Sequence, residues 1–274
     1  MRRAIDKNIR KSPKKKNGDL LGILIISVIV MLIGITMYAF VSVSSKQIPR
    51  DKKTLCRIDG KYDKQIILLD ITGKYNLVQH KTIRQAIENQ VKTLKKDEQL
   101  QLYFITNDIR SGLEPLLSVC NPGTGEDVSG IFANPKMIKQ KWENKLYKPI
   151  EKLLNNFDKE SLEAKSSPIF ETIQLINNSM LKGAKEGTTQ TMTIISDFIQ
   201  HSEDYSFLRN KLQNFSTSNY KLRVKTSFDN IKVNLLFIRR NGREEYLSKK
   251  YLNFWKDYFL KSGSSDIKIK ILEG

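Results

Sequence analysis

The stretch QIILLDITGK, residues 65–74, decides the fold of this chain. Its first half is a short run rich in apolar residues, and the run ends at the acidic Asp70. A continuous apolar run of this length is typical of a strand buried on both faces of a sheet. A polar loop, residues 71–75, then leads into a pattern of helical spacing. We therefore expect a buried strand, a loop beginning at Asp70 and a helix directly after the loop.

The same alternation of strand and helix continues along the chain. It predicts an α/β fold, in which a doubly wound, mostly parallel sheet carries helices on both faces. Residues 107–165 read as an insertion into one domain, not as a second domain. Further strands are predicted at residues 100–106, 191–197, 233–238 and 266–272, and helices at residues 76–95, 135–157, 168–182, 204–215 and 244–262.

Polar side chains occur where these predicted strands end or where a helix begins. Asp70 and Thr72 follow the first strand, Ser167 precedes a helix, and the pair Ser196-Asp197 ends the third strand. In an open parallel sheet, ligands bind beyond the carboxyl ends of the strands. Oxygen ligands of this kind suit Mg²⁺, Mn²⁺ or Ca²⁺. The pattern predicts a divalent-cation site, although the same residues could simply cap helices and bond loop amides.

In order and spacing, residues 62–273 resemble a von Willebrand factor A domain. Asp70 and Thr72 match its first metal-binding loop, Ser167 its second, and Asp197 its third. The resemblance implies a metal-ion-dependent adhesion site at which a partner's acidic side chain completes the coordination. Lys74 stands where the family has a hydroxyl ligand, and an ammonium group has no lone pair to offer. Its charge could instead occupy the metal position and pair with Asp70 or Asp197, or bind the partner's acid directly.

A second resemblance leads to a different function. The loop that begins at Asp70 also looks like the aspartyl-phosphate loop of haloacid dehalogenase-like phosphatases, in which the aspartate is the nucleophile. Thr106 would then bind phosphate, and Asp197 with Asp204 would bind magnesium. Thr72 stands where most of those phosphatases have a general acid, and the loop leaves little room for their flap. A binding protein without catalytic residues is therefore the favoured hypothesis.

A run without charges, residues 20–43, precedes the domain. It is long enough to span a bilayer as a helix and too long for the apolar core of a cleaved secretory signal. The leader, residues 1–19, has eight basic residues against Asp6 and Asp19, a net charge of +6. This bias predicts a cytoplasmic N-terminus and a periplasmic or extracellular C-terminal domain. Residues 44–64 read as a stalk, and residues 65–274 as the domain.

Composition adds expectations about partners. The whole chain carries +18, so +12 remains outside the leader. A solvated lysine-rich surface explains this charge most simply, and it also favours an acidic protein partner. No nucleic-acid-binding motif accompanies the charge, so we do not expect nucleic acid. Cys56 and Cys120 would share an oxidising compartment that permits a disulfide, but their spacing alone does not establish one.

Together these patterns predict a membrane-anchored binding or scaffolding protein. The lysine-rich composition fits a bacterial component of an envelope, secretion or conjugation assembly. That assignment of a setting rests on analogy with what such domains do elsewhere.

Overall fold

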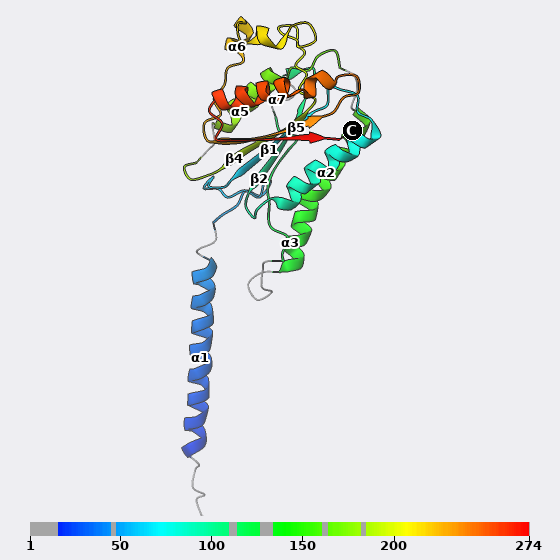
Figure 1. Cartoon of the computed structure of the whole chain (residues 1–274). Helices are drawn as coiled ribbons and strands as arrows, with labels where there is room; N and C mark the ends of the chain where they lie inside the picture. The colour runs from blue at the N-terminus through cyan, green and yellow to red at the C-terminus, as the bar shows by residue number, and fades with distance from the viewer. Residues whose placement is uncertain are drawn as a thin grey trace, which may run out of the picture. The chain divides into compact units, whose positions relative to one another are not determined.

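The computed structural model describes residues 16–44, 48–109, 114–126, 134–160, 164–181 and 185–273. The chain forms two compact units, residues 1–48 and residues 49–274. The first unit contains helix α1 (Lys16–Ser44), and the second contains a sheet covered by helices (Figure 1). Residues 1–15 of the predicted basic leader lie outside the described residues.

Helix α1 contains the predicted apolar run. Its segment Leu21–Ser42 has a mean hydropathy of 2.7 over 22 residues, which is long and apolar enough to cross a membrane. Large apolar side chains are exposed along its length. Its few polar groups bond within the helix, since the Ser27 hydroxyl donates to the Leu24 carbonyl and the Thr36 hydroxyl to the Ile33 carbonyl. An N-terminal signal sequence can meet the same criterion of length and hydropathy.

The second unit is built on a six-stranded sheet with the order β3-β2-β1-β4-β5-β6. All neighbouring strands are parallel except β2 and β3, which are antiparallel. A strand order that reverses at β1 is typical of a doubly wound fold, and it confirms the predicted fold class. The strands are β1 (Lys64–Asp70), β2 (Gln99–Ile105), β3 (Leu117–Cys120), β4 (Gln190–Ser196), β5 (Ile231–Ile238) and β6 (Asp266–Leu272).

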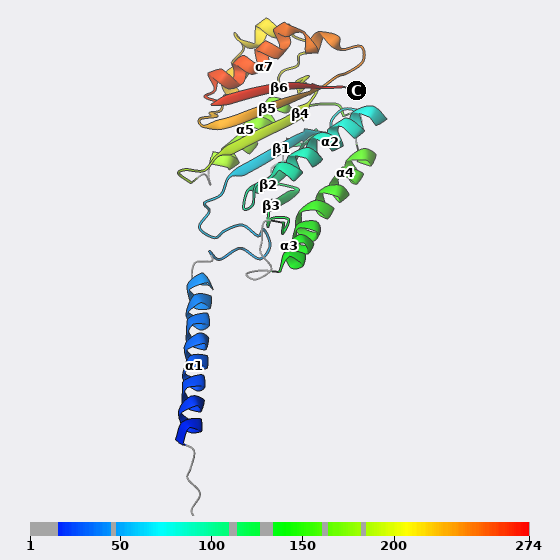
Figure 2. The same cartoon turned by 60° about the horizontal axis from the view of Figure 1, so that its bottom comes forward.

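Helices cover both faces of this sheet (Figures 1 and 2). Ile66 and Leu68 of β1 pack into the core beneath α5 and α7, whereas Ile67 and Leu69 pack into the core beneath α2 and α4. Burial on both faces explains why β1 is an uninterrupted apolar run. The α-helices on the first face are α5 (Ile169–Leu181), α6 (Asn219–Arg223) and α7 (Lys249–Lys261), and those on the second are α2 (Leu77–Thr93), α3 (Pro135–Trp142) and α4 (Lys148–Glu160).

Two predicted helices differ from the structure. The helix predicted at residues 135–157 is interrupted by a π-helical turn, η2 (Glu143–Tyr147), between α3 and α4. The helix predicted at residues 204–215 is wrong, because only its end forms a 3₁₀ turn, η3 (Leu212–Phe215). The backbone before η3 pairs with the chain after β4 instead, since the Phe207 N–H donates to the Gln200 carbonyl at 2.9 Å. A second 3₁₀ turn, η4 (Glu244–Leu247), precedes α7.

The predicted stalk, residues 44–64, also differs from the structure, because the chain from Pro49 onward belongs to the compact domain. A disulfide joins Cys56 to Cys120, whose Cα atoms lie 4.9 Å apart, and both cysteines are buried. Cys120 lies beside Gln99, the first residue of β2, so the disulfide sits at the amino edge of the parallel strands. The chain therefore enters the domain at the edge opposite the carboxyl ends of the strands.

Candidate binding site at the carboxyl edge of the sheet

The loops that follow β1, β4 and β5 meet the start of α5 at the carboxyl edge of the sheet. This arrangement brings three of the four predicted site residues into direct contact. The Asp70 carboxylate accepts hydrogen bonds from the Thr72 hydroxyl at 2.6 Å and from the Ser167 hydroxyl at 3.3 Å. The fourth residue, Asp197, directs its carboxylate to a different partner, which is described below.

Asp70 is the centre of a closed hydrogen-bond network. One of its oxygens accepts from the Thr72 amide and hydroxyl, and the other accepts from the hydroxyls of Ser167 and Ser196, the latter at 2.6 Å. Only 1% of the residue is exposed. Ser196 is the last residue of β4, and its place beside Asp197 at a strand end predicts it as a candidate ligand. The four acceptor positions of the carboxylate are thus filled by the protein itself.

Burial raises the pKa of the Asp70 carboxyl, and the nearby charge of Asp197 raises it further. The hydrogen bonds from Ser196 and Thr72 act in the opposite direction, because they stabilise the ionised form. The balance lies on the side of a raised pKa. The network therefore relieves part of the cost of burying this acid.

The partner of Asp197 is Arg240, which follows β5. The Arg240 Nε donates to the Asp197 carboxylate at 2.9 Å, and the guanidinium lies 4.3 Å from the centre of the Tyr75 ring. It also donates to the Lys74 carbonyl. Burial lowers the pKa of Arg240, but the charge of Asp197 and the other neighbours more than offset this, so its pKa is raised. Arg240 is therefore a fixed cation at this edge.

Gly73 makes room for that cation. A Cβ atom at this position would lie 1.5 Å from the Arg240 Nη2 atom, far inside van der Waals contact. The loop residue that separates Thr72 from Lys74 must therefore lack a side chain if the guanidinium is to stay where it is. This is a direct steric link between the β1 loop and the end of β5.

Lys74 was predicted as a charge that could occupy the metal position and pair with Asp70 or Asp197, whereas in the structure the cation that pairs with Asp197 is Arg240. Lys74 is exposed, and it forms no ion pair with any residue that the structure describes. Arg240 was missed because its partner comes from another part of the chain. Its place directly after the apolar run of β5, at the ligand-binding edge, was the available signal.

The residues present do not fit a divalent cation alongside Arg240. Their hydroxyls and carboxylates are suitable ligands in type. However, the Asp70 oxygens already accept four hydrogen bonds, and Asp197 is held by a guanidinium whose charge would repel Mg²⁺. Among the described residues, no group of three or more His, Cys, Asp and Glu side chains could hold a metal ion.

A pocket of about 320 Å³ opens at this edge. Three basic residues, Lys74, Arg240 and Arg243, line it together with hydroxyl groups and His201. Burial lowers the pKa of His201, and the charge of Arg209 lowers it further, which favours the neutral imidazole. The pocket thus combines positive charge with hydrogen-bond donors, a combination that binds carboxylates.

The residues of the phosphatase alternative do not form one set. The Thr106 hydroxyl donates to the Asp108 carbonyl at 2.7 Å, and Asp204 pairs with Arg223 at 3.0 Å, whereas Asp197 pairs with Arg240. Asp70 is buried with both oxygens bonded, so neither is open to attack a phosphoester. The arrangement lacks the open nucleophile that this chemistry requires.

Comparison with known proteins finds structural matches but no sequence match. No protein-family model matches the chain, and no curated protein matches it. Among solved structures, it is similar to a von Willebrand factor type A protein from Catenulispora acidiphila, with a TM-score of 0.37 and 11% sequence identity. The match covers 77% of this chain and 38% of that one, so the chain spans well under half of the other protein's length.

Proposed function

We propose that this chain is a membrane-anchored binding protein whose von Willebrand factor A-like domain recognises a protein partner at the carboxyl edge of its sheet. The observation that carries this proposal is the pairing of fixed positive charge with exposed apolar side chains at that edge. Leu77 is 88% exposed and Val78 is 58% exposed, directly after the loop that contacts Arg240. Exposed apolar residues beside charged ones are typical of protein-interaction surfaces.

The ligand chemistry that fits this edge is a carboxylate on the partner. Lys74, Arg240 and Arg243 line the pocket, and Asp197 neutralises only one of the three within the described chain. An acidic side chain entering the pocket would meet charge-assisted hydrogen-bond donors. In this proposal Arg240 supplies the positive charge that a metal ion supplies in the family the sequence resembles.

Two features support an anchored domain outside the cytoplasm. The apolar segment Leu21–Ser42 follows a basic leader, which by the positive-inside bias stays in the cytoplasm. The Cys56–Cys120 disulfide supports the same placement, since disulfides persist in oxidising compartments. We propose a bacterial envelope, secretion or conjugation assembly as the setting, by analogy with the functions of such domains.

Site-specific photo-crosslinking of the full chain in its membrane tests the proposed partner site. A photoreactive residue at position 77 or 243 should form a discrete crosslinked product with a protein. Lys74→Glu, an exposed change, and Arg240→Met should each weaken the product, because they remove positive charge from the pocket.

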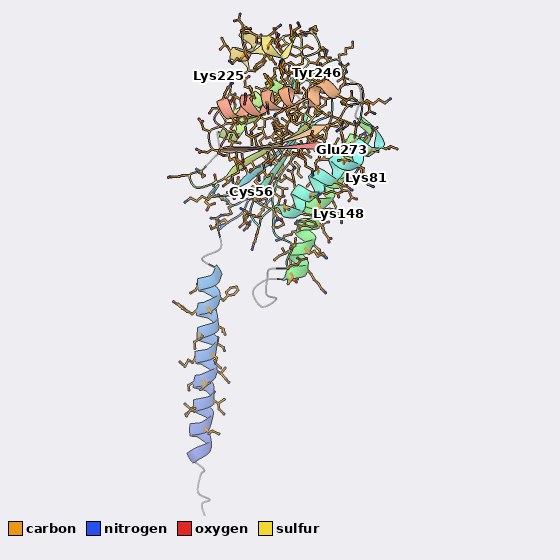
Figure 3. All side chains as sticks on the ribbon, viewed as in Figure 1. Cys56, Lys81, Lys148, Lys225, Tyr246 and Glu273 are labelled. Atoms are coloured by element: carbon orange, nitrogen blue, oxygen red, sulfur yellow. A yellow bond between two sulfur atoms is a disulfide. The ribbon has the colours of Figure 1, made fainter. Side chains whose placement is uncertain are left out.

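The matched control places the photoreactive residue at Lys148, an exposed position at the start of α4 that does not line the pocket (Figure 3). The same product from position 148, or a product that is insensitive to Lys74→Glu and Arg240→Met, would contradict the proposal. A product confined to positions 77 and 243 would support it.

A further inference from the structure

A second surface shares no lining residue with the carboxyl-edge pocket. The segment that contains η3 and α6 forms an outer layer over α7 (Figure 1). Between this segment and α7 runs a groove of about 480 Å³. That volume falls within the range of ligand-binding pockets. We call this cavity the α6–α7 groove.

The floor of the α6–α7 groove is aromatic. The Phe215 ring lies 5.2 Å from the Phe254 ring and 6.3 Å from the Tyr258 ring, centre to centre. Phe215 is buried, whereas Phe254 and Tyr258 are partly exposed to the groove. Leu222, on the wall formed by α6, is 69% exposed. An apolar floor beside an exposed leucine offers buried area to an apolar ligand group.

The walls are held in place by hydrogen bonds. The Tyr258 hydroxyl donates to the Val224 carbonyl at 3.1 Å, which ties α7 to the end of α6. The Gln174 amide donates to the carbonyls of Arg223 and Lys225 at 2.7 and 2.9 Å. These bonds fix the chain directly after α6 against α5 and α7. The groove is therefore preorganised, which lowers the cost of binding.

The rim of the groove is basic. Four exposed lysines line it against a single acid, Asp257. None of the four forms an ion pair with a residue in the described part of the chain, and Lys250 makes only a 3.5 Å bond to Gln213. The lysines are Lys221, Lys225, Lys250 and Lys261, and Figure 3 shows Lys225 on the α7 side of the sheet.

An apolar floor with a basic rim selects a ligand with an apolar stripe between acidic groups. The groove is open along one side, so an acyl chain lying in it would keep part of its apolar surface in water. An amphipathic helix avoids this cost, because it places its apolar residues in a groove and keeps a polar face towards solvent. The shape therefore favours a peptide over a lipid.

We propose that the α6–α7 groove is a second docking site, which binds an acidic amphipathic helix of a partner protein. Leucine-like side chains of that helix would pack against Phe254, Tyr258 and Leu222. Its Asp and Glu side chains would face the lysine rim, with Lys221 and Lys225 on one side. This site does not depend on Arg240 or on the carboxyl-edge pocket.

The test uses the full chain in nanodiscs of zwitterionic lipid and a fluorescent peptide of about 20 residues, long enough to form a helix. The peptide contains Leu, Glu and Ala, with Leu at positions i, i+3, i+4 and i+7 and Glu beside that stripe. Fluorescence anisotropy should report saturable binding that weakens as salt rises. Leu222→Asp and the pair Lys221→Glu with Lys225→Glu should each weaken it by at least about tenfold.

Two protein controls and two peptide controls make the result decisive. Lys81→Glu with Lys148→Glu reverses two exposed charges on the other side of the sheet and should change the affinity less than about twofold (Figure 3). Arg240→Met should also leave it unchanged. A peptide with Lys for Glu and a shuffled peptide without the stripe should both fail to bind.

Three outcomes would overturn the proposal. The first is equal loss of affinity in the Lys81 and Lys148 control. The second is equal binding of the shuffled peptide, which would reduce the effect to unspecific charge attraction. The third is absence of peptide binding together with lysine-dependent binding of phosphatidylglycerol vesicles, which would show that the groove binds an anionic membrane surface and not a peptide.

Discussion

Arg240 is the residue on which the chemistry of the carboxyl edge depends. Its guanidinium holds Asp197 and stands where the neighbouring hydroxyls and carboxylates would otherwise suit a cation. We expect Mg²⁺ to leave the melting temperature of the wild type unchanged and to raise that of Arg240→Ala. At tenfold excess over its dissociation constant, a bound ion adds about 1.4 kcal/mol, or about 3 to 6 °C. Thermal denaturation of the full chain in detergent checks this.

Arg243→Ala is the matched control for that experiment. Arg243 also lines the pocket but forms no ion pair with Asp197, whose ion-pair partner is Arg240. Mg²⁺ should not stabilise this variant. Equal stabilisation of the wild type by Mg²⁺ would show that a metal site coexists with Arg240, and the account of a protein-supplied cation would then be wrong.

Gly73 permits a second prediction at the residue scale. Gly73→Ala should reduce the free energy of unfolding by about 1 to 3 kcal/mol, because the new methyl group displaces a guanidinium that is already paired. In the Arg240→Ala background the same change should cost much less, since the clashing group is gone. A double-mutant cycle from urea denaturation measures the difference. Additive costs would show that Gly73 is needed for another reason.

At the scale of elements, the strands are predictable and the short outer elements are not. β1 and β4 read directly from sequence because both of their faces are buried, which leaves an apolar run in each. The segment 204–215 has a helical pattern, but its backbone pairs with the chain after β4. That pairing closes a turn between Gln200 and Phe207, and helical periodicity does not record it.

The candidate site also contains residues that the sequence predicts and residues that it does not. Asp70, Thr72 and Ser167 were found because loops after parallel strands must meet at one edge. Arg240 was missed because its importance depends on which atoms it contacts. Residue type and place in the topology suggest a candidate ligand. Whether a metal ion or a guanidinium neutralises the carboxylates depends on the three-dimensional arrangement of the side chains.

The disulfide gives a prediction for the segment that precedes β1. Replacing both Cys56 and Cys120 with Ala should lower the free energy of unfolding by about 2 to 4 kcal/mol, because the bond closes a long loop in the unfolded chain. The two residues are separated by 64 positions. Urea denaturation of the full chain in detergent measures the change. A reductant should lower the free energy of unfolding of the wild type by a similar amount and leave that of the double variant unchanged. Equal stability of all forms would contradict the prediction.

At the scale of the whole molecule, the proposed membrane orientation and the oxidation state of Cys56 and Cys120 are coupled. Helix α1 is followed by a domain that contains a buried disulfide. A disulfide persists when the domain lies in an oxidising compartment. If α1 spans the membrane as proposed, its orientation decides whether the segment that precedes β1 is held to the sheet by the disulfide. An inverted chain would expose the same cysteines to reducing conditions and lose that link.

This coupling yields the last prediction, made for the full chain expressed in bacterial cells with a tag at each end. Protease added outside the inner membrane should digest the C-terminal tag and spare the N-terminal one, because the basic leader stays in the cytoplasm. Thiol-reactive polymer added to acid-quenched cells should shift the chain on a gel only after reduction, since both cysteines are paired. A protected C-terminal tag, together with thiols that react without prior reduction, would show the opposite orientation. Loss of the N-terminal tag from a mature chain would instead identify residues 20–43 as a cleaved signal.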